Sequence, residues 1–286
     1  KGLLNKMNQL MYSRGPDDEG YFLESNFGMA MRRLSIIDLK YGSQPIYSKD
    51  KSKVLIFNGE IYNYVELRES LEKEGVSFRT NSDSEVIIEL FEKHGYECLK
   101  YLNGMFAICI WDSKNKNIFL ARDRLGIKPL FYYKDENIFI FSSSLNSLKI
   151  HPSVKIKINH RSLLSYFSSA YIHNPDTIYE NIHKIKPGHS IIFRNNELIE
   201  KRYWKLNFHD NFNSKKFDYD EYIEKTKFLL NNSIKINSRS DVKVGTFLSG
   251  GLDSSYITKE LSSISDKKIS TFTAYFPSKK NDEREL

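Results

Sequence analysis

Residues 54–63 read Val-Leu-Ile-Phe-Asn-Gly-Glu-Ile-Tyr-Asn, an apolar run that ends in the turn-forming pair Asn58-Gly59. Aliphatic and aromatic residues in consecutive positions, bounded by such a pair, predict a strand over residues 54–57. Comparable runs follow in the first half of the chain, at residues 105–111, 118–121, 131–133 and 138–141. The last two runs have the spacing of a hairpin. This part of the chain is therefore predicted to form sheet, interrupted by helices.

Two amphipathic helices are predicted within this region, over residues 63–75 and 82–95. Both end at a glycine, and both begin with a residue that can cap a helix, followed three positions later by glutamate. The pairs are Asn63 with Glu66 and Ser82 with Glu85. This spacing allows the cap and the glutamate to satisfy free amide groups at the helix start.

A polar stretch without hydrophobic periodicity, residues 207–220, predicts a linker between a first domain over residues 1–206 and a second over residues 221–286. The first domain is expected to end in a hairpin over residues 190–203. The second is expected to contain a helix and a β-α-β unit, with helices at residues 219–237 and 254–263 and strands at residues 242–248 and 269–276. The strands of such units are parallel, with a right-handed crossover.

The loop Ser249-Gly-Gly-Leu-Asp-Ser-Ser255 lies between the strand and the helix of this unit. Ligands of open parallel sheets bind at this position, because the start of the helix presents free amide groups and its positive dipole end. Gly250 and Gly251 let phosphate oxygens approach the backbone, while the serines add hydroxyl donors. These serines are Ser249, Ser254 and Ser255. Asp253 could hold Mg²⁺ or a water on the phosphates.

The loop is neither a Walker A motif, which requires a lysine, nor the Gly-x-Gly-x-x-Gly of dinucleotide folds. For a lone Gly-Gly pair, a helix cap with a glycine turn would be the better interpretation. The whole seven-residue string, however, resembles the pyrophosphate loop of the ATP pyrophosphatases, which adenylate a carboxylate or carbonyl and release pyrophosphate. The resemblance implies that Leu248 and residues 272–274, with Ala274 among them, flank the adenine of ATP.

Five more motifs precede the loop. In chain order they are Arg14-Gly-Pro-Asp17, Arg33-Leu-Ser-Ile-Ile-Asp38, Asn58-Gly-Glu-Ile-Tyr-Asn63, Ser82-Asp-Ser-Glu-Val86 and Arg122-Asp-Arg-Leu-Gly-Ile-Lys-Pro129. With the loop, they resemble the glutamine-hydrolysing asparagine synthetases over nearly the whole chain. The resemblance implies an α+β N-terminal-nucleophile (αββα) glutaminase domain, followed by an α/β ATP-pyrophosphatase domain with a parallel sheet that is truncated at its C-terminus.

The upstream residue types suit glutamine hydrolysis. This reaction builds negative charge on the amide oxygen, which the Asn58 side chain and the Gly59 backbone amide can stabilise as an oxyanion hole. Glutamine also carries an α-carboxylate and an α-ammonium, for which we assign Arg33 to the first and Glu60 with Asp83 to the second. Singly, these residues fit a turn, a surface ion pair or a helix-dipole contact as well. Their joint occurrence in this order favours a glutamine site.

The nucleophile that the resemblance implies is a cysteine directly after the initiator methionine, and no residue of this chain matches it. The two cysteines, Cys98 and Cys109, fall in apolar segments that are typical of buried free thiols. We therefore expect that an N-terminal segment is missing from this sequence. A catalytically silent glutaminase-like module is the alternative.

The resemblance implies a reaction in two steps. Glutamine is hydrolysed in the first domain, and the ammonia moves to the second, where ATP with Mg²⁺ converts aspartate to β-aspartyl-AMP. Ammonia then displaces AMP to give asparagine. A relative that amidates another carboxylate, of a sugar, a β-lactam or a peptide precursor, fits the same motifs, because the acceptor pocket is expected beyond Leu286. The fragment is therefore expected to be incomplete for catalysis.

The composition, with 40% hydrophobic and 28% charged residues, is that of a soluble globular protein. No run reaches the roughly 18 apolar residues of a membrane span, and residues 1–14 lack the apolar stretch of a signal peptide, so we expect a cytoplasmic protein without a membrane partner. The net charge of +7 is dispersed, with no basic stripe that would indicate nucleic-acid binding. The expected partners are glutamine, aspartate and ATP, and a homodimer is left open.

Overall fold

The computed structural model describes residues 1–208, 218–266 and 268–275. The chain forms two compact units, residues 1–206 and 207–286. Each unit is considered by itself. No helix in the described ranges is both long enough and apolar enough to span a bilayer.

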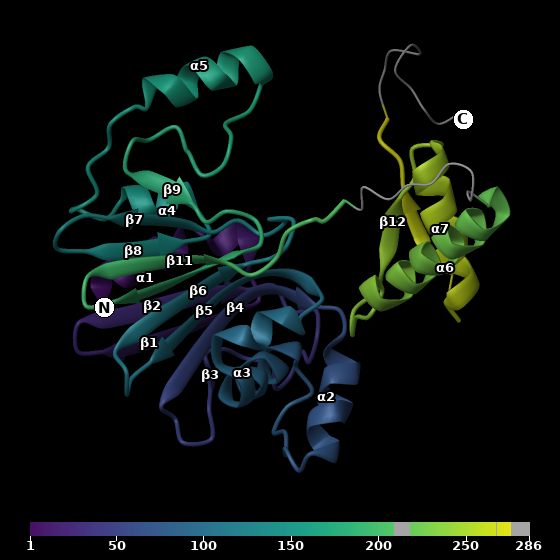
Figure 1. The fold of residues 1–286 in the computed structure, drawn as a ribbon, viewed down its shortest axis with the longest axis horizontal. Coiled ribbons are helices and arrows are strands. Elements are labelled where there is room, and N and C mark those ends of the chain that lie inside the picture. The colour runs from purple at the N-terminus through teal and green to yellow at the C-terminus, as the bar shows by residue number, and fades with distance from the viewer. Residues whose placement is uncertain (209–217, 267, 276–286) are drawn as a thin grey trace. The chain divides into compact units, whose positions relative to one another are not determined.

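The centre of the first unit is a six-stranded antiparallel sheet in the order β11-β10-β6-β5-β4-β3 (Figure 1). Its strands are β3 (Ile46–Tyr47), β4 (Lys53–Ile61), β5 (Gly104–Asp112), β6 (Asn117–Arg122), β10 (His189–Arg194) and β11 (Glu197–Arg202). The predicted apolar runs form its middle, and the hairpin predicted near residues 190–203 forms its edge as β10 and β11. Each of the runs at residues 54–57, 105–111 and 118–121 is extended by one or more residues in the observed strand.

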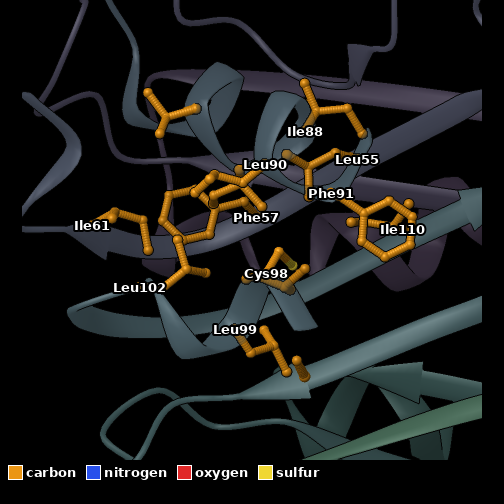
Figure 2. Packing of buried hydrophobic residues seen from close by; sticks show 14 of the residues in the cluster. Leu55, Phe57, Ile61, Ile88, Leu90, Phe91, Cys98, Leu99, Leu102 and Ile110 are labelled. Carbon is orange, nitrogen blue, oxygen red and sulfur yellow. The ribbon is translucent and has the colours of Figure 1, made fainter. Parts of the chain in front are cut away.

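One face of this sheet is covered by helices α2 (Tyr64–Lys73) and α3 (Asp83–His94) and by the 3₁₀ segment η2 (Gly95–Lys100). Side chains alternate along a strand, so β5 contributes Phe106, Ile108 and Ile110 to this face. They join a core cluster that includes Leu55 and Phe57 of β4, seen in Figure 2. Fully burying side chains of this size stabilises the fold by about 1.5–3 kcal/mol each.

The opposite face carries the intervening residues of the same strands, such as Cys109 and Trp111 of β5. They pack against a second layer of sheet made of two separate parts, β1-β2 and β8-β7-β9. The strands are β1 (Asp18–Glu24), β2 (Phe27–Arg33), β7 (Phe131–Lys134), β8 (Phe139–Ser142) and β9 (Ile182–Lys184). The ring of Phe27 on β2 stacks on Trp111 at 4.2 Å between centroids.

A third cluster closes the outer side of this second layer. Met7 of α1 (Gly2–Gln9) and Leu148 of α4 (Leu145–Lys149) pack there with Tyr133 and Ile140. The first unit is therefore a sandwich of helix, sheet, sheet and helix, which confirms the predicted αββα arrangement. Two further short elements are η1 (Tyr12–Arg14) and α5 (His160–Ser169).

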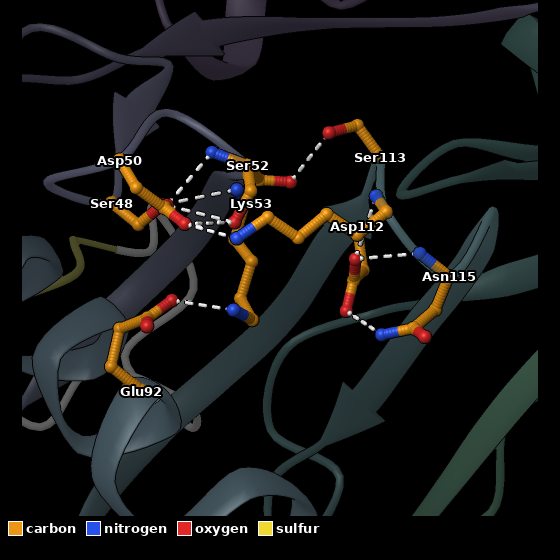
Figure 3. Close-up of polar contacts among 9 residues, drawn as sticks. Ser48, Asp50, Ser52, Lys53, Glu92, Asp112, Ser113 and Asn115 are labelled. Atoms are coloured by element: carbon orange, nitrogen blue, oxygen red, sulfur yellow. Dashed lines mark hydrogen bonds and ion pairs between the residues drawn. The ribbon is translucent and has the colours of Figure 1, made fainter.

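Two loops at one end of the central sheet are joined by polar contacts (Figure 3). The Asp50 carboxylate accepts hydrogen bonds from the Ser48 and Ser52 hydroxyls and binds Lys114 Nζ at 2.6 Å. These contacts hold the pKa of Asp50 well below its ordinary value, with the Lys114 contact the largest cause. Lys53 on β4 adds an ion pair of 2.8 Å to Glu92 on α3, so the helix is tied to the sheet by charge as well as by packing.

The second unit contains a helix and a β-α-β unit. Helix α6 (Tyr219–Asn237) has the predicted bounds, and β12 (Gly245–Phe247), α7 (Leu252–Ile264) and β13 (Ser270–Phe272) follow. The two strands pair in parallel, as predicted, with Thr246 opposite Thr271. Both strands are shorter than the predicted runs, and residue 276 of the second run lies outside the described residues.

The predicted capping boxes are wrong in their side-chain partners. Asn63 does occupy the cap position of α2, but its side chain makes no cap contact. Its Nδ2 donates to the Tyr101 carbonyl at 3.0 Å, and its Oδ1 accepts from the Asn103 backbone amide at 2.9 Å. Ser82 does cap α3, by accepting from the Ser84 amide. Glu85 turns away from the cap and accepts hydrogen bonds from the amide groups of Arg79 and Thr80, because that loop has unsatisfied donors of its own.

Candidate functional site

A polar cavity of about 350 Å³ opens in the first unit, and we call it the Arg33 cavity. Arg33, Asn58, Gly59, Glu60 and Asp83 all line it. These residues come from the end of β2, from β4 and from the start of α3. The structure thus gathers into one cavity all five residues that were assigned to glutamine from the sequence.

The Asn58-Gly59 pair lies inside strand β4, not after it as predicted from the apolar run. Gly59 has a φ of +153°, and a Cβ at this position would meet the Met105 carbonyl oxygen of β5 at 1.9 Å. Only glycine fits such an approach of two backbones. Phe57, which precedes the Asn58-Gly59 pair, is also held in place. The Gln44 side chain accepts from its backbone amide at 2.7 Å and donates to its carbonyl at 3.1 Å.

Arg33 is buried, and its guanidinium is oriented by the loop that follows β2. Its Nη2 donates to the carbonyl oxygens of Ile37 and Asp38, at 2.7 and 3.0 Å. Gly42 makes room for this arrangement, since a Cβ there would lie 2.4 Å from Nη2. The Asp38 carboxylate accepts from the Asn81 amide at 2.7 Å and so ties the loop to the segment before α3. The guanidinium is therefore fixed relative to Asp83.

Asp83 is the first residue of α3, and its Oδ2 accepts a hydrogen bond from the Ile61 amide at 2.9 Å. This contact joins the start of the helix to the end of β4. Burial raises the pKa of Asp83 to about 6, and the charge of Glu60 adds to the rise. Glu60 is half-buried, and burial raises its pKa as well. The cavity therefore holds two carboxylates that a bound ammonium group would stabilise in their ionised form.

Neither cysteine lies at the Arg33 cavity. Cys98 belongs to the helix-side core cluster, and Cys109 to the cluster between the two sheets. Burial raises the pKa of Cys98 to about 12 and that of Cys109 well above its ordinary value. Both thiols are therefore unreactive at neutral pH, as expected from their sequence surroundings.

A second cavity, of about 370 Å³, lies beside the first, and we call it the β2–β8 cavity. Residues 26–32 line one side and residues 138–143 the other, with helix α1 above them. Its walls are largely apolar, as Met29 and Phe139 exemplify. The two cavities share lining residues, including Arg14 and Asn58, and so adjoin at the amide side chain of Asn58. This cavity was not predicted from the sequence, because strands β1 and β2, which form one side of it, were not predicted.

In the second unit, residues 248–251 connect β12 to α7, and residues 252–255 form the first turn of α7, which begins two residues earlier than predicted; we keep the name 249–255 loop for the whole string. Gly250 has a φ of +77°, and Gly251 caps the helix without a side chain. Ser254 Oγ contacts Ser249 Oγ at 3.1 Å and the Gly251 carbonyl at 3.0 Å. The loop is exposed and is closed by its own hydrogen bonds, which is the form expected of an anion-binding turn at a helix start.

The residues implied for adenine adjoin the loop. The Leu248 amide donates to the Phe272 carbonyl at 2.9 Å, and Thr273 Oγ1 donates to the Leu248 carbonyl at 2.7 Å. Ala274 follows in the same segment. Asp253 is exposed in the first turn of α7. In the described ranges no three His, Cys, Asp or Glu side chains gather as a metal site.

Comparison with known proteins agrees with both halves of this description. Residues 1–204 match the family described as "Glutamine amidotransferase domain", and residues 225–286 match "Asparagine synthase". The chain belongs to the glutamine amidotransferase domain family, and its C-terminal part carries the asparagine synthase match.

Two relatives show the extent of the similarity. The chain is 39% identical over 256 residues to asparagine synthetase [glutamine-hydrolyzing] 1 of Bacillus subtilis, covering 89% of this chain and 40% of that protein. It is 39% identical over 300 residues to putative asparagine synthetase [glutamine-hydrolyzing] 2 of Methanocaldococcus jannaschii, covering 96% of this chain and 57% of that protein. The chain thus spans about half the length of these relatives.

Among solved structures, the glutamine phosphoribosylpyrophosphate amidotransferase of B. subtilis is similar with a TM-score of 0.45 and 17% identity. The match covers 86% of this chain and 51% of that one.

Proposed function

We propose that this chain carries the glutamine site and part of the ATP site of a glutamine-dependent asparagine synthetase. The observation that supports the first half best is the convergence of Arg33, Asn58, Gly59, Glu60 and Asp83 on one cavity. These residues lie far apart in the chain, and their charges complement those of an amino-acid zwitterion. The fold alone does not require them to line one cavity.

In this proposal Arg33 binds the α-carboxylate of glutamine. Its Nη2 is occupied by two carbonyl oxygens, which leaves the rest of the guanidinium fork for the ligand. Asp83 and Glu60 bind the α-ammonium. The Asn58 side chain and the Gly59 amide stabilise the oxyanion that forms on the side-chain carbonyl.

Cys98 lines neither cavity, and Cys109 lines only the β2–β8 cavity, where burial raises the pKa of its thiol well above the ordinary value, so neither is assigned as the nucleophile. We propose that a cysteine preceding Lys1 supplies it, as the family resemblance implies. The β2–β8 cavity meets the Arg33 cavity at Asn58 and so provides room for such a residue beside the proposed oxyanion hole.

The 249–255 loop is proposed to bind the phosphates of ATP through its backbone amides and serine hydroxyls. Mg²⁺ usually takes one or two carboxylates and completes its shell with water and substrate phosphate. Asp253 fits the role of such a single carboxylate, and the ion would neutralise phosphate charge during adenylation. Aspartate is the proposed acceptor, through β-aspartyl-AMP, and ammonia from glutamine completes the amide. A sugar, β-lactam or peptide carboxylate is the alternative acceptor.

Calorimetric titration of the chain with L-glutamine tests the glutamine half without requiring a nucleophile. We expect saturable binding at one site at pH 7.5, with weaker binding of L-glutamate, and loss of binding in Asp83→Asn. Asp135→Asn, a change in the turn between β7 and β8, serves as the matched control and should bind as the unaltered chain does. Absence of glutamine binding, or binding that Asp83→Asn leaves intact, would contradict the assignment.

A further inference from the structure

Lys128 also lines the Arg33 cavity, beside the two carboxylates. We propose that Lys128 is a positioning residue of this cavity, which balances the charge of Glu60 so that Glu60 stays ionised beside Asp83 and the two carboxylates accept one ammonium group of the substrate. The inference rests on the proposed glutamine function and extends it to the basis of substrate selection.

The backbone of Lys128 is held from both sides by buried charged residues. The Arg122 guanidinium donates to the carbonyl oxygens of Lys128, Gly126 and Ile185, at 2.8, 2.7 and 2.8 Å. The Asp123 carboxylate, fully buried, accepts from the Lys128 amide at 2.9 Å and from the Phe106 amide at 3.2 Å. Loops are usually mobile, but these bonds give this one a fixed shape.

The same bonds fix where Lys128 stands relative to the carboxylates. Phe106 on β5 is the strand partner of Gly59 on β4, and Met105 is the partner of Glu60. Through Asp123, the loop is therefore anchored to the strand position opposite the Asn58-Gly59-Glu60 segment.

The ammonium group of Lys128 has no assigned structural task. Within the described ranges, neither Lys128 nor Glu60 makes a side-chain hydrogen bond or an ion pair. Two other cations of the cavity already have partners, since Arg32 pairs with Glu19 at 2.9 Å and Nη2 of Arg33 donates to backbone carbonyls, while the rest of the Arg33 guanidinium is assigned to the substrate carboxylate.

The charged groups around Glu60 indicate what the Lys128 charge does. Asp83 on α3 repels it, and the Tyr62 phenol beside it stays neutral because burial raises its pKa to about 12. Arg14 lies exposed, and the charge of Lys128 opposes the rise that burial causes in the pKa of Glu60. The charges of Glu60 and Asp83 are then balanced by Lys128 and Arg33, so the cavity suits a ligand with one ammonium group, for the carboxylates, and one carboxylate, for Arg33. This balance favours a zwitterionic amino acid over a diamine or a dicarboxylate.

The test combines Lys128→Met and Glu60→Gln in a double-mutant cycle of L-glutamine binding, measured by calorimetry between pH 6 and 8.5. Lys128→Met should weaken binding by about tenfold at pH 6.5 and by less than about twofold at pH 8.5, because Glu60 then requires a higher pH to ionise. Lys128→Arg should retain affinity to within about twofold. In the Glu60→Gln background, Lys128→Met should add no loss. Lys73→Met, on the exposed end of α2, is the control.

Several results would overturn the inference. An equal loss at every pH, or the same loss in the Glu60→Gln background, would show that Lys128 acts on the substrate directly or only on the fold. If Lys128→Met lowers the melting temperature strongly, Lys128→Gln replaces it, and the same pH dependence is required. If the unaltered chain does not bind glutamine at all, the proposed function fails, which differs from a chain that binds glutamine but is indifferent to Lys128.

Discussion

The Arg33 cavity and the 249–255 loop are built in opposite ways. The cavity takes its residues from β2, β4, α3 and the 122–130 segment, and buried contacts such as Gln44 with Phe57 hold them in place. The loop takes its groups from seven consecutive residues, and its hydrogen bonds run within the loop itself. The first site therefore depends on the packing of the whole unit, whereas the second depends on local geometry. Substitutions should separate the two.

The largest effect is expected for Gly59→Ala. The new methyl group would overlap the Met105 carbonyl oxygen at 1.9 Å, and the φ of +153° is strained for any other residue. We expect a loss of at least about 3 kcal/mol of unfolding free energy, together with loss of glutamine binding. Denaturant titration measures the first quantity. Gly75→Ala is the control, because its φ of +90° is strained but nothing lies within 4 Å, so it should cost only about 1 kcal/mol.

A change beneath Arg33 should weaken binding by displacing the guanidinium. In Gly42→Ala the methyl group would lie 2.4 Å from Arg33 Nη2 and 2.6 Å from the Asp38 carbonyl oxygen, so the guanidinium and the loop that orients it must both move. We expect glutamine affinity to fall by about tenfold, the effect of one displaced charged hydrogen bond. L-Glutamine analogues that lack the α-carboxylate should bind equally to both proteins. A similar fall for those analogues would indicate general distortion of the cavity.

The residues of the Arg33 cavity differ in how far they could be predicted from the sequence. Arg33, Asn58 and Asp83 could be predicted because they occur in short motifs whose residue types suit glutamine binding. Gly42 and Gln44 could not be found in this way, because their roles arise from contacts with Arg33 and Phe57 that only the folded chain creates.

The same limit applies to the fold. The long apolar runs of β4 and β5 were recognisable, and α6 was placed at its observed bounds. Strand β2, with the sequence Phe-Gly-Met-Ala-Met-Arg-Arg, alternates large apolar with small or charged residues and lacks a β-branched run. Asn63 satisfies the capping spacing, yet its side chain binds a loop that is distant in sequence. Tertiary contacts outweigh local preference at such places.

The pH dependence of glutamine binding offers a smaller effect with a defined sign. The α-ammonium binds ionised Asp83, whose pKa is raised to about 6. Affinity should therefore fall by up to tenfold per pH unit below about pH 6 and be level above it. The unfolding free energy should instead decrease as pH rises from about 4 to 6. A carboxyl whose pKa is higher in the folded than in the unfolded chain contributes stability at low pH and loses that contribution over this range. Glutamine titrations of the unaltered chain check the first, and melts of the chain and of Asp83→Asn check the second. The same pH dependence of stability in Asp83→Asn would show that Asp83 is not the titrating group.

The smallest effect on stability is expected in the loop. Ser254→Ala removes contacts to Ser249 and to the Gly251 carbonyl, all exposed, so unfolding free energy should change by less than about 1 kcal/mol. Binding of inorganic pyrophosphate or ATP should weaken, while glutamine affinity stays the same. Ser263→Ala, near the other end of α7, is the matched control. Loss of glutamine binding in Ser254→Ala would contradict the separation of the two sites.

A crystal structure of the chain grown with saturating L-glutamine tests the central claim most directly. The account requires glutamine in the Arg33 cavity, with its α-carboxylate on Arg33, its α-ammonium on Asp83 and Glu60, and its amide oxygen at the Asn58 side chain and the Gly59 amide. An empty cavity, or glutamine bound in it with the two ends exchanged, would contradict the account.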